Sequence, residues 1–279
     1  MRRPDLEVLV RYATAQGLRV GLSPSATPEL LEKNFWDLKE AGVKRLALSL
    51  DGATREVHDA FRGVEGTWDL AMEAVQRARE AGIELQINTT FTRQNIGDYD
   101  RFVEVLERIE PVLWSVFQLV PTGRGSEDDL LTADEMEALF QKLYRLSVEA
   151  RFDVKTTEGH HYRRVVLQES KDVERLKGRA PLGVNDGKGF VFVSHTGNIY
   201  PSGFLPVPAG NVKGEELLDV YREHPQFRAL RDPSRLKGKC AACEFKTICG
   251  GSRARAFAMS GDLFAQEPLC WYQPAGWGA

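Results

Sequence analysis

Cysteine is scarce in this sequence: four occur among 279 residues, and all of them lie between positions 240 and 270. No apolar run is long enough to cross a membrane, and no apolar signal region follows the arginines at positions 2 and 3. A net charge of −3 gives no excess of positive charge for general nucleic-acid or membrane binding. We therefore expect a cytoplasmic protein whose partners include neither nucleic acid nor membrane.

The remaining composition is that of a globular protein, with 42% hydrophobic and 28% charged residues. In the first half, short apolar runs alternate with amphipathic segments of helical spacing. A single helix is predicted over 28–41. The runs that predict strands are 18–22, 43–50, 83–91, 113–120 and 152–156. Repeated strand–helix units of this length favour a parallel sheet, curved or closed as a barrel.

Small polar residues stand where the predicted strands end. Ser49 and Asp51 end the second predicted strand, and Asn88 lies inside the third. In barrel-like α/β folds, ligands bind at the carboxyl ends of the strands. Turn formation is an alternative explanation for Asp51, which precedes a glycine, but it explains Asn88 less well because Asn88 lies within a β-branched run. We therefore predict a ligand-binding rim at these strand ends.

The cysteines have the spacing C-x2-C-x5-C-x20-C, formed by Cys240, Cys243, Cys249 and Cys270. Two cysteines separated by two residues can direct both sulfurs to one centre, and the Gly-Gly pair after the third cysteine lets backbone N–H groups approach the sulfurs. Two disulfides fit the even count, but disulfides are rare in reducing compartments. The spacing therefore predicts a metal centre and leaves zinc and a [4Fe–4S] cluster open.

The second half of the sequence follows a different pattern. Residues 189–201 predict a β-hairpin. Ser252 is predicted to cap a helix over 253–260 whose positive end points toward the cysteines. Residues 157–187 are rich in charge, and the pair His160-His161 has no third metal ligand at a suitable spacing. We therefore expect this histidine pair on a solvated helix face.

Several motifs are informative in combination. They are Leu-Ser-Leu-Asp-Gly at 48–52, His-Asp-Ala-Phe-Arg-Gly at 58–63, Ile-Asn-Thr-Thr-Phe-Thr at 87–92, Gly-Asn-Ile-Tyr-Pro at 197–201 and the four cysteines. Together they resemble the radical S-adenosylmethionine (SAM) superfamily, in particular members with the cysteine-rich extension called SPASM or, in shorter form, twitch. The resemblance implies an α/β fold. A partial (β/α)6 barrel without its first strands would cover residues 1–157, a connection 158–187, and a small α+β SPASM/twitch domain 188–279.

The sequence departs from the family pattern in two ways. The motif C-x3-C-x2-C, which holds the SAM-cleaving [4Fe–4S] cluster in the family, does not occur in it. We interpret the sequence as N-terminally truncated and expect it to be inactive unless that segment is restored. In addition, Ser202 and Arg253 stand where members with two auxiliary clusters have cysteines. Because neither residue is a good iron ligand, the resemblance implies a single auxiliary [4Fe–4S] cluster, held by the four cysteines.

The family's chemistry implies a function in which a 5′-deoxyadenosyl radical from SAM modifies a peptide or a tetrapyrrole-like substrate. Ser49 and Asn88 would contact SAM, since neutral hydrogen-bonding side chains suit its ribose and amino-acid groups. An electron donor such as a ferredoxin or flavodoxin is an expected partner. SAM and a second [4Fe–4S] cluster are expected only in a full-length form, and no catalytic residue can be named. The alternative is a non-catalytic four-cysteine protein that binds zinc or an iron–sulfur cluster for electron transfer or partner binding.

Overall fold

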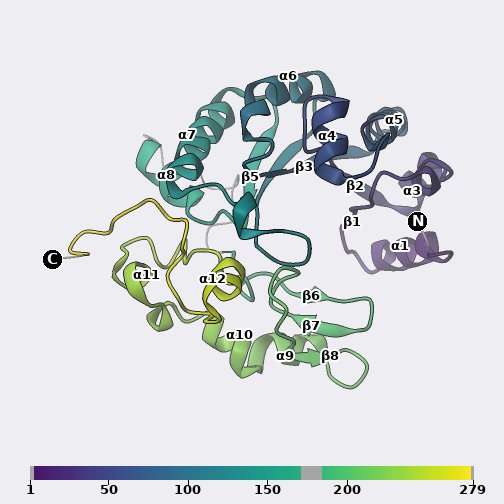
Figure 1. The fold of residues 1–279 in the computed structure, drawn as a ribbon. Coiled ribbons are helices and arrows are strands. Elements are labelled where there is room, and N and C mark those ends of the chain that lie inside the picture. Colours follow the sequence, from purple (N-terminus) through teal and green to yellow (C-terminus); the bar gives the residue numbers. More distant parts are fainter. Residues whose placement is uncertain (1–2, 171–183, 278–279) are drawn as a thin grey trace. The chain divides into compact units, whose positions relative to one another are not determined.

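The computed structural model describes residues 3–170 and 184–277 (Figure 1). These residues form two compact units. Unit 1 comprises Met1–Phe117 and Glu149–Lys155, and unit 2 comprises Gln118–Val148 and Thr156–Ala279. The three-part division predicted from the sequence remains a prediction, and residues 171–183 of its connecting segment lie outside the described residues. No helix in the described part of the chain is both long and apolar enough to cross a membrane.

Unit 1 contains nearly all of a five-stranded sheet whose strands follow one another in chain order, β1-β2-β3-β4-β5. The β1/β2 and β2/β3 pairs are parallel. The strands are β1 (Val20–Leu22), β2 (Val43–Ser49), β3 (Glu84–Phe91), β4 (Leu113–Gln118) and β5 (Asp153–Thr157). The helices of unit 1 are α1 (Leu6–Ala15), α2 (Pro28–Leu31), α3 (Phe35–Ala41), α4 (Arg55–Arg62), α5 (Thr67–Glu80) and α6 (Tyr99–Ile109). Sequential parallel strands joined by helices are what the predicted barrel type requires.

The prediction of a single helix over 28–41 is wrong, because the structure has two helices there, α2 and α3. Asn34 separates the two helices: its backbone is extended, and its side-chain oxygen accepts a hydrogen bond of 3.1 Å from the Trp36 N–H. This contact is an N-cap, which starts a new helix where the apolar periodicity alone suggests a continuous one.

The core of unit 1 gathers aromatic side chains between β3, β4 and α6. Trp114 and Phe102 are almost completely buried, and Phe91 packs edge-on against both rings. The indole N–H of Trp114 donates to Thr89 Oγ1 at 2.9 Å, so its one polar atom is satisfied inside the core. Burial of rings this large stabilises the unit by about 2–3 kcal/mol per side chain.

The turn after β2 is held by buried polar contacts around Asp51. Its carboxylate accepts the Thr90 N–H at 2.7 Å and forms an ion pair with Arg62 at 2.6 Å. Its own N–H donates to Nδ1 of His58 at 3.0 Å. A side chain at Gly52 would come within 2.6 Å of the His58 backbone nitrogen, which explains the glycine at this position. The contacts of Asp51 are therefore those of a residue that fixes the turn between β2 and α4.

Unit 2 is built around a small antiparallel sheet and a group of short helices. Its elements are α7 (Ala133–Glu149, largely within this unit), α8 (Tyr162–Glu169), β6 (Phe192–Val193), β7 (Asn198–Tyr200), β8 (Gly210–Asn211), α9 (Leu217–Glu223), α10 (Pro225–Leu230), α11 (Gly238–Ala242) and α12 (Arg253–Ser260). One apolar cluster joins Ile199 to Val220 and Phe227, and a second joins Leu205 to Ala254. The predicted hairpin and the predicted helix over 253–260 are both present.

We predict that His58 makes unit 1 sensitive to acid. Burial lowers the pKa of His58 to about 4, so below pH 6.5 the unfolded chain binds a proton that the folded chain does not. The contribution of neutral His58 to the free energy of unfolding is thus present above pH 6.5 and is lost as the pH falls toward 4. Between pH 7.5 and 5.0 the wild type should lose about 2 kcal/mol that His58→Asn retains. Urea titrations at both pH values measure this, and a wild-type-to-variant difference independent of pH would contradict it.

Candidate functional site

Within unit 1, the two predicted rim residues lie next to each other. Ser49 ends β2 and is paired in register with Asn88 on the parallel neighbour β3. Both side chains are partly exposed. The Gln86 amide donates to Asn88 Oδ1 at 2.7 Å, which fixes the orientation of the Asn88 side chain. The structure therefore places two neutral hydrogen-bonding groups side by side at this end of the sheet.

Within unit 2, the four cysteines line a single pocket. Cys240 lies in α11, Cys243 directly follows that helix, Cys249 precedes α12, and Cys270 lies in the C-terminal segment. All four are free thiols. The four cysteines identified from their spacing in the sequence therefore lie together in space, as a shared metal centre requires.

The distances between the sulfurs bear on the kind of centre. No three of these four described sulfurs lie within 4.8 Å of one another. A single zinc ion with bonds of about 2.3 Å would draw its four sulfurs closer than this, whereas a four-iron cube binds each sulfur to a different iron and spaces them more widely. Backbone N–H groups also point at sulfur: Glu267 donates to Cys240 at 3.3 Å and Gly251 to Cys249 at 3.4 Å. Four thiols with backbone N–H groups directed at two of the sulfurs are a donor set that fits a [4Fe–4S] cluster.

The protonation chemistry of these thiols also depends on a metal. Burial raises the pKa of Cys249 to about 12 and that of Cys270 to about 11, and it raises the pKa values of Cys240 and Cys243 as well. Metal ligands have to be thiolates. Burial therefore opposes ionisation at all four positions, and a bound cationic centre would supply the compensation.

Several polar side chains fix the backbone of the pocket wall. Lys239 donates to the carbonyl oxygen of Cys270, and Lys246 donates to that of Ala241 at 2.9 Å. The Asn185 amide donates to the carbonyl oxygens of Cys249 and Gly251 at 3.0 and 2.8 Å. None of these contacts follows from local periodicity, so sequence reasoning did not identify these residues.

The Gly-Gly pair after Cys249 has a structural reason. Gly250 and Gly251 both have positive φ, 69° and 65°, a conformation that other residues adopt at a cost. A side chain on Gly251 would also come within 2.7 Å of Glu267 Cβ. The pair lets the chain turn closely around the cysteine before α12 begins.

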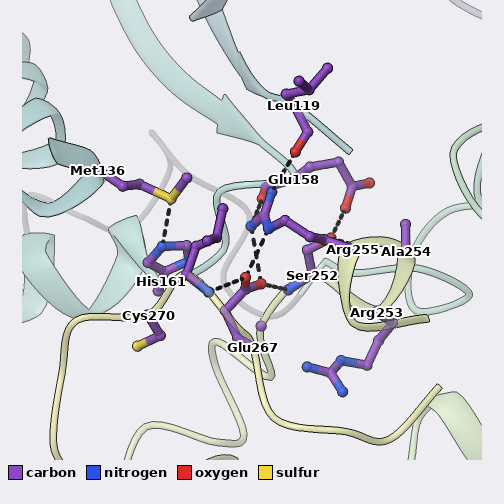
Figure 2. A network of polar contacts seen from close by, with 12 residues as sticks. Leu119, Met136, Glu158, His161, Ser252, Arg253, Ala254, Arg255, Glu267 and Cys270 are labelled. Carbon is purple, nitrogen blue, oxygen red and sulfur yellow. Dashed lines mark hydrogen bonds and ion pairs between the residues drawn. The ribbon is translucent and has the colours of Figure 1, made fainter. Parts of the chain in front are cut away.

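A buried ion pair stands at the edge of this pocket (Figure 2). The guanidinium of Arg255 contacts both carboxylate oxygens of Glu267, at 2.8 and 3.0 Å, and neither side chain is more than 1% exposed. Arg255 also donates to the carbonyl oxygens of Leu119 and Glu158. Burial alone raises the pKa of Glu267, but the charge of Arg255 outweighs it and brings that pKa to about 2. Glu267 is therefore ionised, and it lines the pocket.

The N-terminus of α12 corrects one expectation. Ser252 caps the helix as predicted, accepting the Arg255 N–H at 2.9 Å. The N–H groups of Arg253 and Ala254, however, donate to the carboxylate of Asp186 at 3.0 and 3.1 Å. The positive end of the helix thus serves a carboxylate rather than the cysteine sulfurs, because a buried carboxylate competes strongly for these donors.

The prediction of a solvated histidine pair is wrong. His160 and His161 are 7% and 2% exposed. The ring nitrogen Nε2 of His161 contacts the sulfur of Met136 at 3.0 Å (Figure 2), and its ring packs edge-on against Phe140. The high charge of the segment does not place these histidines in solvent: Arg164, in the same segment, forms an ion pair with Glu137 and is itself buried.

The amino-acid sequence of this chain is similar to those of known proteins. The sequence profile described as "Radical SAM superfamily" matches residues 2–106. The chain is 39% identical to the "AdoMet-dependent heme synthase" of Methanosarcina barkeri, over 98% of this chain and 80% of that protein. It is 27% identical to the "Fe-coproporphyrin III synthase" of the same organism, over 96% of this chain and 72% of that one.

The fold resembles solved structures as well. Streptococcus suis SuiB bound to S-adenosylmethionine superposes with a TM-score of 0.71 at 18% identity, covering 97% of this chain and 64% of that chain. An identity this low carries the fold alone. The predicted α/β fold with a partial barrel is confirmed, and the assignment of the cysteine-rich part as a SPASM/twitch domain remains a prediction.

We predict that the buried ion pair dominates the stability of unit 2. Arg255→Ala leaves the Glu267 carboxylate buried without its counter-charge. This change should lower the free energy of unfolding by about 3–5 kcal/mol. Thermal unfolding measures the loss. Asp69→Asn, which breaks the exposed ion pair with Arg55, serves as the control and should change the midpoint little. Equal shifts in the two variants would contradict the assignment.

Proposed function

The chain belongs to the radical SAM superfamily, and we propose that it takes part in the SAM-dependent modification of a tetrapyrrole of the iron-porphyrin type. One observation carries the proposal: the similarity to an AdoMet-dependent heme synthase runs along 98% of this chain. A peptide is the alternative substrate, because a SuiB structure contains its precursor peptide SuiA. That likeness is one of fold, whereas the likeness to the heme synthase extends through the sequence.

We propose that Cys240, Cys243, Cys249 and Cys270 hold one auxiliary [4Fe–4S] cluster. The shared pocket, the wide spacing of the sulfurs and the two backbone N–H groups that point at sulfur support this ligand set. Four cysteines complete the coordination of the cube, so we assign it to electron transfer or architecture. The protein's own part is to hold the thiolates in place and to limit their contact with water.

We propose that Ser49 and Asn88 contact SAM. Their adjacency at the carboxyl ends of two parallel strands supports this role, since such ends are the usual ligand rim of barrel-like folds. A hydroxyl and an amide can each donate to and accept from the polar groups of SAM. Asp51 has a different role, because its contacts with Arg62, His58 and Thr90 are all within the protein.

The cluster that cleaves SAM does not fit the residues at hand. The 279 residues contain four cysteines, and all four line the pocket of unit 2. No further thiolates remain for the C-x3-C-x2-C motif. We propose that these residues alone are inactive and that radical chemistry requires the motif to be supplied.

An electron donor such as a ferredoxin or flavodoxin is part of the proposal, because a [4Fe–4S] centre must be reduced before it can cleave SAM. We also propose a cytoplasmic location, since a centre held by four thiolates suits a reducing compartment. The second candidate function is a non-catalytic four-cysteine protein that binds zinc or a cluster for electron transfer or partner binding. The four thiols that line one pocket would be sufficient for it.

Anaerobic reconstitution tests the cluster. We expect close to four irons and four sulfides per chain and no tightly bound zinc, since one cube uses all four thiolates. The same protein should form no 5′-deoxyadenosine from SAM and a reductant. A chimera that adds an N-terminal segment with the C-x3-C-x2-C motif should restore that product. One zinc without sulfide would reject the cluster, and 5′-deoxyadenosine from the 279 residues alone would reject the need for the motif.

Porphyrin binding tests the substrate class. Fe-coproporphyrin III, the iron porphyrin in the name of one relative, should bind the reconstituted chimera with a shifted Soret band and should increase 5′-deoxyadenosine formation. A porphyrin product of altered mass completes the test by mass spectrometry. A chimera that cleaves SAM but ignores iron porphyrins, and responds instead to a peptide, would replace the tetrapyrrole by the alternative. A cluster-loaded chimera with no SAM cleavage at all would favour the non-catalytic function.

A further inference from the structure

A second group of potential ligands lies in unit 2 outside the cysteine pocket. One ligand atom each from Glu158, His160 and Asp186 lies within 4.8 Å of the other two, and all three residues are buried. Glu158 and His160 belong to the short turn between β5 and α8, and Asp186 precedes the hairpin. Contacts between distant parts of the chain thus bring two carboxylates and an imidazole to one point.

The imidazole of His160 is the part that the protein alone leaves unexplained. Its side chain is 7% exposed, and neither Nδ1 nor Nε2 has a hydrogen-bond partner. A buried polar group without a partner lowers the stability of the folded state. Burial lowers the pKa of His160 well below its usual value, so the ring is neutral, which is the form that binds metals.

The two carboxylates are held in place by groups on their outer side. Glu158 Oε2 accepts the hydroxyl of Ser252, and Asp186 Oδ2 accepts the backbone N–H groups of Arg253 and Ala254. Outer hydrogen bonds of this kind orient the ligands of metal sites. Two buried carboxylates this close also repel each other unless a proton or a cation lies between them.

Two nearby arginines direct part or all of their donors to other groups. Arg255 pairs with Glu267. Arg253 directs Nη1 to the carbonyl oxygens of Leu263 and Ala265, at 3.0 and 2.6 Å. Nε and Nη2 of Arg253 have no hydrogen-bond partner among the described residues. The charges of both arginines lower the affinity of the group for a further cation.

We propose that Glu158, His160 and Asp186 bind one divalent first-row metal ion, of the class Mn²⁺, Fe²⁺ or Zn²⁺. Two carboxylates and one imidazole are a ligand set that these ions accept. The ion would give His160 its missing partner and separate the two carboxylates. This site is distinct from the cysteine pocket and does not depend on which substrate the protein modifies.

The ion's position indicates what it would do. Asn185, next to Asp186 in the chain, donates to the carbonyl oxygens of Cys249 and Gly251. Ser252 and the first turn of α12 are held by Glu158 and Asp186. A bound ion would therefore fix the segment that carries Cys249 to the turn before α8.

Manganese binding tests the proposal on the anaerobic, cluster-loaded chain. Mn²⁺ is a suitable probe because it prefers carboxylate to thiolate ligands and is visible by electron paramagnetic resonance. We expect one Mn²⁺ per chain, with a nitrogen coupling from one imidazole in the wild-type spectrum. Glu158→Gln and Asp186→Asn should each weaken binding about tenfold or more, and His160→Gln should remove the nitrogen coupling.

Glu137→Gln is the matched control, since it alters a largely buried carboxylate of the same unit that pairs with Arg164, and it should leave Mn²⁺ binding unchanged. Failure of the wild type to bind Mn²⁺, or binding without nitrogen coupling, would overturn the proposal. Equal binding by the wild type and by the folded Glu158→Gln and Asp186→Asn variants would overturn it too. The wild-type spectrum decides the question even if a variant does not fold.

Discussion

Compensation of buried charge is the constraint on which unit 2 depends. Arg255 neutralises Glu267 where both side chains are nearly inaccessible to water, and a buried carboxylate without such a partner would destabilise the unit severely. Glu267 then connects this ion pair to the cysteine pocket: its carboxylate accepts the Ser252 N–H at 2.7 Å, and its own N–H donates to the Cys240 sulfur. The same residue therefore stabilises the fold and contacts the sulfur of Cys240.

Unit 1 uses the same principle for a different purpose. Asp51 is buried, but its contacts with Arg62 and Thr90 hold the end of β2 against β3. The adjacent pair Ser49 and Asn88 carries no charge and remains partly exposed at the strand ends. The charged Asp51 fixes the backbone, whereas the neutral Ser49, two positions earlier, is available to a ligand. Only the contacts in the structure distinguish these two roles.

The segment after β5 is buried, although its sequence has no clear periodicity and many charges. Its high charge suggested a solvated connection, yet Glu158, His160 and His161 are all buried in unit 2. Two carboxylates are buried there beside an imidazole whose nitrogens have no hydrogen-bond partner in the described part of the chain, and burial of such a group is costly. The metal ion that we propose would offset the repulsion of the carboxylates and give the imidazole a partner.

The sequence by itself determined most strands and helices, the cap and extent of α12, and the family, because each depends on local periodicity or on the spacing of motifs. It also picked out the four cysteines. Only the tertiary structure decided how the sulfurs are spaced and which polar residues are buried together. Arg255 and Glu158 are 97 positions apart, and Ser252 and Glu158 are 94 apart. Contacts over such separations follow from packing, which no local pattern encodes.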